Sequence, residues 1–351
     1  KLIRRYCEVN NTFISNLKIG SIMKKILTIL LVLVMVAAVT ATTVFFLYPY
    51  QPDRPPQADD TGSTQQGVQE VVDANNQFAF ELYSELNKAE DGNIFYSPYS
   101  ISAALAMTYE GAKGQTADEI KSVFHFPETN TLRSNFASIY NDINKKDKPY
   151  TLSTGNALWA QQDYKFLDEY LSTVEKYYGG KAANVDFVGE TEKSRQTINT
   201  FIEEQTNNKI KDLIPQGILD ASTVLVLTNA IYFKGTWVKQ FDKKDTRDED
   251  FTTISGQKVK TPMMRLTGDD AEFNYAETDE IQILEMPYDG EDLSMLILLP
   301  KENNLGTMED SITNGKLSEW RNMLNEQRVD IYIPKFEFDT KYFMKETLSK
   351  M

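Results

Sequence analysis

The stretch NIFYSPYSISAALAM, residues Asn93–Met107, decides how this part of the chain should fold. It sets Ser97 and Pro98 between two apolar runs. Serine is a preferred N-cap, and proline suits the first helical position because its missing N–H would have no intrahelical partner there. The pattern therefore predicts a helix that starts at Pro98, faces the core and ends near Gly111. A second serine, Ser100, places another hydroxyl in this otherwise core-facing segment.

Size and composition point to a globular protein. The chain has 351 residues, of which 41% are hydrophobic, so it can fill the core of one large domain or two ordinary ones. The single cysteine, Cys7, rules out an intramolecular disulfide. Residues 68–351 hold 30 basic and 47 acidic side chains, a balance of −17. Such a body repels phosphate backbones, so we do not expect nucleic acid as a partner.

The amino-terminal part has the pattern of an export signal or a membrane anchor. Met23-Lys24-Lys25 precedes 26–48, which is 23 residues without a charge. Small residues at 39–41 favour cleavage, whereas the apolar run at 44–48 favours an uncleaved anchor. Both alternatives place the folded part outside the cell or on the outer face of its membrane.

The chain is therefore divided into four parts. Residues 1–22 are predicted to be upstream sequence outside any domain, and 23–48 to be the signal peptide or anchor. Residues 49–67, with four prolines, are predicted to be a solvated tether. The folded domain is expected at 68–351.

Within that domain the apolar periodicity predicts an α+β fold. Helices are expected at 68–91, 98–111, 116–123, 166–178, 190–207, 305–325 and 341–351, and strands at 150–160, 181–187, 222–233, 251–264, 272–288, 293–299 and 329–338. These elements do not alternate regularly, which argues against a doubly wound parallel sheet. The run STVLVLTNAIYF at 222–233 is nearly all apolar and predicts a central strand buried on both faces.

No catalytic, metal or cofactor motif stands out. The one histidine, His125, lies between Phe124 and Phe126, where a structural role is the better interpretation. The sequence has no nucleophile elbow, no phosphate-binding glycine loop and no zinc-binding histidine pair. We therefore predict a protein that is not an enzyme and needs no cofactor or metal. An exported hydrolase using His125 remains a remote alternative.

Seven segments, in order, resemble the serpins, the family of serine protease inhibitors. They are NIFYSPYSISAALAMTYEGAKGQTADEI (Asn93–Ile120), LSTGNALWAQ (Leu152–Gln161), VDF (Val185–Phe187), INTFIEEQTNNKIKDLI (Ile198–Ile214), VLTNAIYFKGTWVKQFD (Val226–Asp242), ILEMPYDG (Ile283–Gly290) and VDIYIPKFEFD (Val329–Asp339). The resemblance covers roughly residues 68–351 and indicates a prokaryotic-type, exported or membrane-anchored member. It implies the serpin fold, a mixed core of several sheets surrounded by helices.

The resemblance also implies a mechanism. A target serine protease, or less often a cysteine protease, cleaves an exposed reactive loop, and the loop then enters the central sheet as a new strand. The protein is thus a suicide substrate and is expected to be a monomer when complete. Two regions of the family control this opening of the sheet. Matched to this chain, the shutter consists of Ser97, Pro98, Ser100, Asn156 and Asn229, and the breach contains Trp237.

Without the family, these residues have simpler interpretations. Ser97 would be only an N-cap and Trp237 only a core aromatic residue. Asn229 is the sharper case, because an amide on an apolar strand must find buried partners or cost about 1 to 3 kcal/mol. We therefore expect Asn229 to be hydrogen bonded. The helix at 190–207 matches the one that lies across the opening sheet.

The sequence also departs from the family. It stops at Met351, inside a predicted helix, whereas serpins continue with a sheet strand, a hinge, the reactive loop and two closing strands. We expect the chain to be a truncated form in which these strands and the reactive-site bond are absent. Without a hinge sequence, a serpin that inhibits nothing and acts as a carrier, chaperone or storage protein stays open as an alternative.

Overall fold

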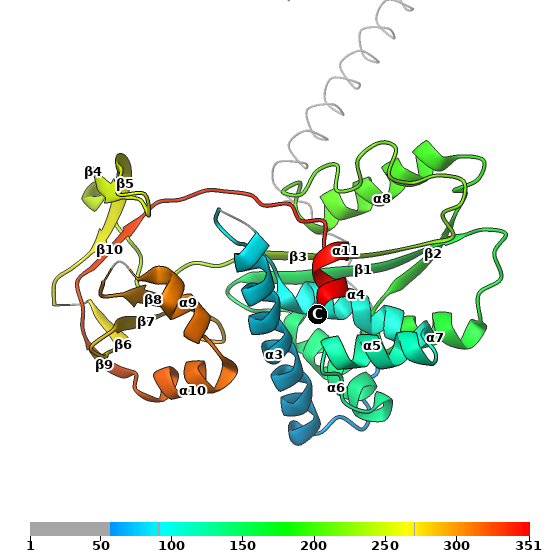
Figure 1. The fold of residues 1–351 in the computed structure, drawn as a ribbon, viewed down its shortest axis with the longest axis horizontal. Coiled ribbons are helices and arrows are strands. Elements are labelled where there is room, and N and C mark those ends of the chain that lie inside the picture. The colour runs from blue at the N-terminus through cyan, green and yellow to red at the C-terminus, as the bar shows by residue number, and fades with distance from the viewer. Residues whose placement is uncertain (1–56, 90–91, 270, 303) are drawn as a thin grey trace, which may run out of the picture. The chain divides into compact units, whose positions relative to one another are not determined.

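The computed structural model describes residues 57–89, 92–269, 271–302 and 304–351 (Figure 1). These described residues belong to one compact unit, Pro55–Met351. The predicted upstream segment and the predicted signal or anchor lie outside the described residues. Within the described part of the chain, every helix is too short or too polar to cross a membrane.

The described unit has the predicted α+β composition. Its helices are α3 (Gln65–Ala89), α4 (Pro98–Gly111), α5 (Gln115–Val123), α6 (Thr129–Ile143), α7 (Asp168–Tyr178), α8 (Thr191–Gln205), α9 (Leu305–Ser311), α10 (Asn314–Asn322) and α11 (Lys345–Lys350). Its strands are β1 (Thr151–Gln161), β2 (Lys181–Val185), β3 (Leu225–Lys234), β4 (Arg247–Thr252), β5 (Lys258–Leu266), β6 (Glu272–Glu277), β7 (Ile281–Pro287), β8 (Ser294–Pro300), β9 (Asn325–Arg328) and β10 (Ile331–Pro334).

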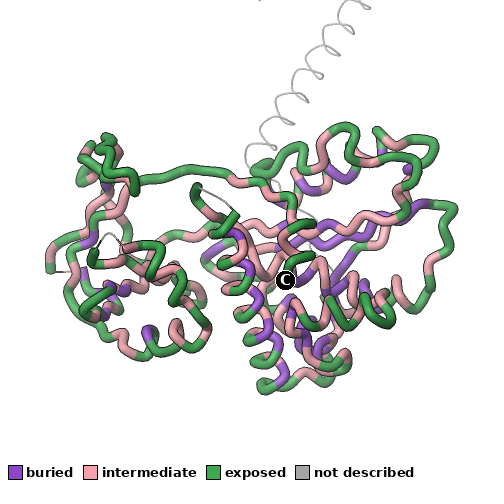
Figure 2. The backbone as a smooth tube through the Cα atoms, viewed as in Figure 1, coloured by how far each residue is buried: buried purple, intermediate pink, exposed green. Residues whose placement is uncertain are grey.

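The first half of the unit is built on a sheet with the order β2-β1-β3. β1 pairs parallel with β2 and antiparallel with β3, and it is the most deeply buried strand of the three (Figure 2). Alternate side chains of a strand point to opposite faces. Accordingly, Leu158 and Ala160 pack on the core formed by α3, α4 and α6, whereas Ala157 and Trp159 pack on α8. The sheet thus lies between α8 on one face and α3, α4 and α6 on the other (Figure 1).

The prediction that 222–233 is a central strand is wrong for the described residues. β3 pairs only with β1, and in the part of the chain that the structure describes no strand lies along its other edge. Both faces make contacts, with the helical core at Leu225 and Leu227 and with the α8 cluster at Val226, but these side chains are half-buried and only Thr228 and Ala230 are buried. An apolar sequence shows that a strand contacts the core. It carries no information on which strands lie along the edges.

The second half contains two more sheets, β10-β5-β4 and β8-β7-β6-β9. Trp320 of α10 is buried on the second of these, against Ile281 and Ile283. The helix predicted at 305–325 is split into α9 and α10, because Thr313 caps a new helix by accepting a hydrogen bond from the Lys316 N–H at 3.1 Å.

The carboxy-terminal elements are shorter than predicted. The strand expected at 329–338 is β10 alone, and the helix expected at 341–351 is confined to α11. Residues 335–344 between them form neither helix nor strand.

The segment before α3 also differs from the expected solvated tether at 49–67. Ala58 is only 3% exposed and exchanges hydrogen bonds with the side chain of Asn141, at 2.9 and 2.8 Å. The Thr64 N–H donates to Asn135 at 2.9 Å, and α3 already begins at Gln65. Residues 58–64 are therefore docked on α6.

Asp59 makes this docking sensitive to acid. Hydrogen bonds from Thr61, together with the nearby Lys176, lower the pKa of Asp59 to about 2. A carboxylate with a lowered pKa stabilises the folded state above its unfolded pKa of about 4, and the effect is lost as the pH falls toward the folded value. We expect the urea midpoint of the wild type to exceed that of Asp59→Asn at pH 6, with the difference vanishing by about pH 2. A difference that stays constant over this range would contradict the assignment.

Candidate functional site

The start of α4 brings together the three predicted residues of the opening stretch. Ser97 is the N-cap, with extended backbone dihedral angles, and its side chain accepts a hydrogen bond from the Ser100 N–H at 3.2 Å. Pro98 occupies the first helical turn. This arrangement confirms the predicted helix start. It also fixes Ser100 in the first turn, from which its hydroxyl reaches the sheet.

The sheet places Asn156 and Asn229 side by side. The two residues are direct partners in the antiparallel ladder between β1 and β3. They share a face with Leu158 and Leu227, which pack on the helical core, so both amides lie on the side of the sheet that α4 covers. Asn156 is 2% exposed.

These side chains form one continuous hydrogen-bonded chain, which we name the serine–asparagine chain. The Ser100 hydroxyl donates to the Asn229 carbonyl oxygen, and the Asn229 amide donates to the Asn156 carbonyl oxygen. The Asn156 amide in turn donates at 2.7 Å to the backbone oxygen of Tyr178, the last residue of α7. The predicted partners of Asn229 are therefore present, although only Asn156 is buried and Ser100 is half-buried. Tyr178 was not predicted, because it takes part through its backbone.

The opposite face of the same two strands is also polar near this point. The Trp159 indole donates to the Thr228 hydroxyl at 3.0 Å. Gly155 allows α8 to approach closely, since a Cβ there would lie 2.5 Å from the side chain of Gln205. The centre of the sheet is thus held by hydrogen bonds on both faces, with α8 directly above it.

Trp237 is not part of the serine–asparagine chain. It lies beyond the carboxy-terminal end of β3 and forms a β-bridge with Tyr288, and the two rings stack with centroids 4.2 Å apart. Phe233 contacts Tyr288 edge-on at 4.8 Å and Tyr150 at 6.2 Å. An aromatic row therefore joins the end of the β1–β3 pair to the turn after β7.

A hydrogen bond and an ion pair to Asp292 lie next to this aromatic row. Lys148 and Tyr150, just before β1, both contact the carboxylate of Asp292 at 3.0 Å. The hydrogen bond from Lys148 lowers the pKa of Asp292, and the contact with Tyr150 raises the pKa of Lys148. These contacts could not be predicted from the sequence, because Asp292 lies more than 140 residues from Lys148 and Tyr150.

His125 has a structural partner. It follows α5 with a positive φ of 53°, and its Nε2 lies 2.7 Å from Glu81 of α3. The hydrolase alternative would need this ring beside a nucleophilic serine, and no such contact is found in the described part of the chain. No group of three or more His, Cys, Asp or Glu side chains among the described residues is arranged to hold a metal.

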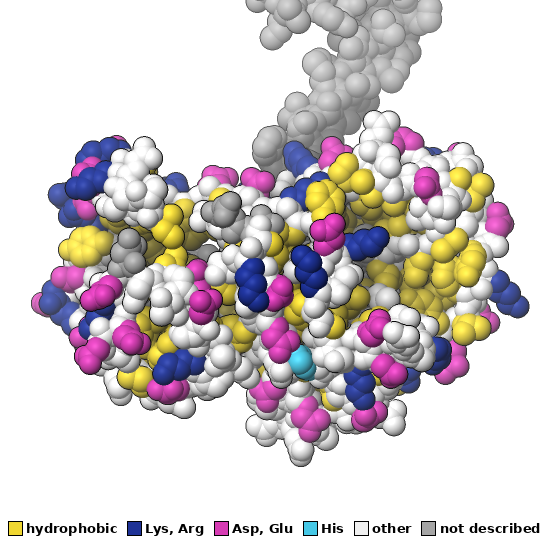
Figure 3. Space-filling model, in the orientation of Figure 1, with side chains coloured by type: hydrophobic (Ala, Val, Ile, Leu, Met, Phe, Trp, Pro, Cys, Tyr) yellow, Lys and Arg dark blue, Asp and Glu magenta, His cyan; other side chains and the backbone are white. Residues whose placement is uncertain are grey.

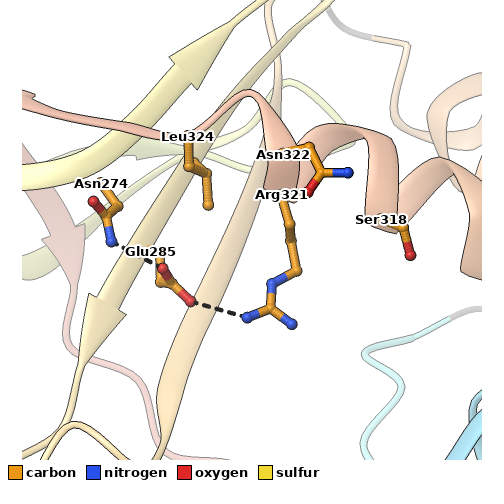
Figure 4. Close-up of a pocket in the computed structure, with 6 residues that line it drawn as sticks. All are labelled: Asn274, Glu285, Ser318, Arg321, Asn322 and Leu324. Carbon is orange, nitrogen blue, oxygen red and sulfur yellow. Dashed lines mark hydrogen bonds and ion pairs between the residues drawn. The ribbon is translucent and has the colours of Figure 1, made fainter. Parts of the chain in front are cut away.

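One surface pocket lies apart from the serine–asparagine chain (Figure 4). It has a volume of about 350 Å³ and is lined by Asn274, Glu285, Ser318, Arg321, Asn322 and Leu324. Its central carboxylate, Glu285, is already engaged by Asn274 at 3.1 Å and Ser294 at 2.8 Å, and forms an ion pair with Arg321 at 3.6 Å. On the face shown in Figure 3, acidic and basic side chains are interspersed over the surface.

Comparison with known proteins gives a consistent result. Residues 73–351 match the family model described as Serpin (serine protease inhibitor). A serpin-like protein of Methanosarcina mazei is 42% identical over 287 residues, which cover 80% of this chain and 67% of the relative. Human Serpin B3 is 39% identical, with 80% and 77% covered. The structure of emu (Dromaius novaehollandiae) ovalbumin superposes with a TM-score of 0.77 at 32% identity and covers 80% of this chain and 77% of that one.

Proposed function

Because this chain belongs to the serpin family, we propose that it inhibits serine endopeptidases as a suicide substrate whose cleaved loop enters the sheet beside β3. Serpins are typically inhibitors without enzymatic activity, and the prediction of a protein that is not an enzyme agrees with this membership. The observation that carries the proposal is the serine–asparagine chain, which joins α4 to the β1–β3 pair at the centre of the sheet.

The chemistry of that chain suits a sheet that must open. If a strand enters beside β3, β3 has to shift over the start of α4. Apolar contacts tolerate such a shift poorly when they interlock, whereas hydroxyls and amides can both donate and accept and so can change partners. Ser100, Asn229 and Asn156 are side chains of this kind on three different elements.

A strand that enters the sheet beside β3 would gain backbone hydrogen bonds. An unpaired strand edge presents N–H and C=O groups that another strand can satisfy. A new strand of about ten residues would form about ten backbone hydrogen bonds, each worth about 1 kcal/mol net. This gain is the driving force that the mechanism requires.

The proposal is tested on the full-length protein with trypsin-like, chymotrypsin-like and subtilisin-like proteases. We expect an SDS-stable complex with at least one of them. We also expect cleavage of the loop to raise the melting temperature by roughly 20 °C or more, from about 10 kcal/mol at 2 to 4 °C per kcal/mol. Cleavage without a complex and without this gain would reject the inhibitor and favour a carrier, chaperone or storage protein.

We further propose that the protein acts outside the cell, either released or anchored through residues 26–48. The support is the basic and apolar pattern at 23–48, which is typical of export. Fractionation of cells that express the full chain tests this. Recovery of the protein from the cytoplasm would contradict it.

A further inference from the structure

An ion pair with a buried carboxylate lies next to Tyr178, whose backbone oxygen is the last acceptor of the serine–asparagine chain. Glu110, in the last turn of α4, has a side chain that is only 1% exposed. Arg133 of α6 donates three hydrogen bonds to it, at 2.6, 3.0 and 3.2 Å. A buried carboxylate is tolerated only when it is paired and hydrogen bonded, and this geometry meets both conditions. Removing one partner of such a pair is therefore costly.

Tyr178 connects this pair to the sheet. Its hydroxyl donates to Glu110 at 2.8 Å, while its backbone oxygen accepts the hydrogen bond from Asn156 at 2.7 Å. Burial and the charge of Glu110 raise the pKa of the phenol well above its usual value, so the hydroxyl remains a donor at neutral pH. One residue thus holds the ion pair with its side chain and the serine–asparagine chain with its backbone.

The backbone oxygen of Tyr178 is an acceptor that α7 itself leaves unused. The last four carbonyls of a helix have no intrahelical partner. Tyr178 ends α7, and Gly179 follows in a left-handed conformation with φ of 60°. The direction of this oxygen depends on how the end of α7 is held. The Gly179 and Gly180 N–H groups bond to the Val174 oxygen, and the Tyr178 hydroxyl adds its bond to Glu110.

We propose that Glu110, Arg133 and Tyr178 are positioning residues of the serine–asparagine chain. They fix the acceptor of Asn156, so that α4 is tied to the sheet at both ends, by Ser100 at its start and by Glu110 at its end. The functional role of these three residues rests on the proposed inhibition by sheet opening. In that mechanism, their contacts would set how readily β1 and β3 move. The physical coupling itself is measurable without any protease.

Native-state hydrogen exchange of the full chain tests the coupling through Tyr178→Phe. This variant removes one hydroxyl and keeps the ring. Because a hydrogen bond to a charged group is worth about 1.5 to 3 kcal/mol, we expect amides at the ends of the network to exchange roughly ten- to hundredfold faster. The decisive amides are those of 155–158 in β1, which bonds directly to Tyr178, and of 227–230 in β3, one strand further away.

Three further variants separate positioning from general stability. Glu110→Gln keeps an oxygen that Tyr178 can donate to, so it should disturb the β1–β3 amides less than Glu110→Leu does. Glu192→Gln is the matched control: Arg195 likewise donates twice to this carboxylate, at 2.9 and 2.8 Å, but the Glu192 side chain is 48% exposed. This control should leave those amides unchanged.

The proposal is overturned if Tyr178→Phe speeds exchange only around 107–111, 130–136 and 175–180. It is equally overturned if all amides accelerate by the same factor, since that factor would report a loss of global stability. A different outcome concerns the proposed function. If the variants show the expected exchange but the full-length protein forms no complex with a protease, the proposed function is rejected and the coupling stands.

Discussion

Asn229→Ala is expected to lower the free energy of unfolding by about 2 to 4 kcal/mol. The buried Asn156 oxygen loses its partner at a cost of about 1 to 3 kcal/mol, and the half-buried Ser100 hydroxyl loses a hydrogen bond worth about 1 kcal/mol. Asn229 accepts from Ser100 and donates to Asn156, so it is the only member of the serine–asparagine chain whose two bonds both run to other side chains across element boundaries. Chemical denaturation of the wild type and variant measures the change directly.

The matched control is Asn184→Ala. Asn184 lies on β2 of the same sheet but is exposed, so its replacement should change stability by no more than about 0.5 kcal/mol. A second check uses Ser100→Ala. Once Asn229 has been replaced, the loss of the Ser100 hydroxyl should cost little, because its partner is already gone. Additive losses in the double variant would show that the two side chains do not depend on each other.

The core of this site was predictable from sequence for a physical reason. Ser97 and Pro98 act locally, through capping, so their roles are visible in a few residues. Asn229 interrupts an apolar strand, and a buried amide needs a partner. Both signals depend on the cost of burying a polar group without satisfying it.

The rest of the network could not be predicted in this way. Tyr178 contributes a backbone oxygen, which every residue has, and its hydroxyl is one of 18 tyrosine hydroxyls in the chain. Glu110 and Arg133 are 23 residues apart, on helices whose packing is known only from the structure. The same holds for the docking of 58–64, which relies mainly on backbone groups that bond to Asn135 and Asn141. Contacts of this kind leave no pattern in a sequence.

Gly179→Ala is expected to be the most disruptive small substitution near this site, for two separate reasons. Gly179 has φ of 60°, where a residue with a Cβ loses about 1 to 2 kcal/mol. A Cβ would also lie 2.1 Å from the ring of Tyr140, which is fully buried, and overpacking of this kind typically costs about 1 to 3 kcal/mol. We expect a total loss of about 2 to 5 kcal/mol in chemical denaturation.

Gly217→Ala separates the two causes. Gly217 also has a positive φ, of 85°, but a Cβ there would meet nothing within 4 Å. Its replacement therefore carries only the backbone part, about 1 to 2 kcal/mol. Gly179 directly follows Tyr178, so the collision with Tyr140 should also shift the Tyr178 oxygen that accepts from Asn156. Hydrogen exchange of the β1–β3 amides should therefore become faster in Gly179→Ala but not in Gly217→Ala. Equal losses of stability in the two variants would mean that the ring of Tyr140 moves aside at no cost, and that the end of α7 is not held as rigidly as its contacts indicate.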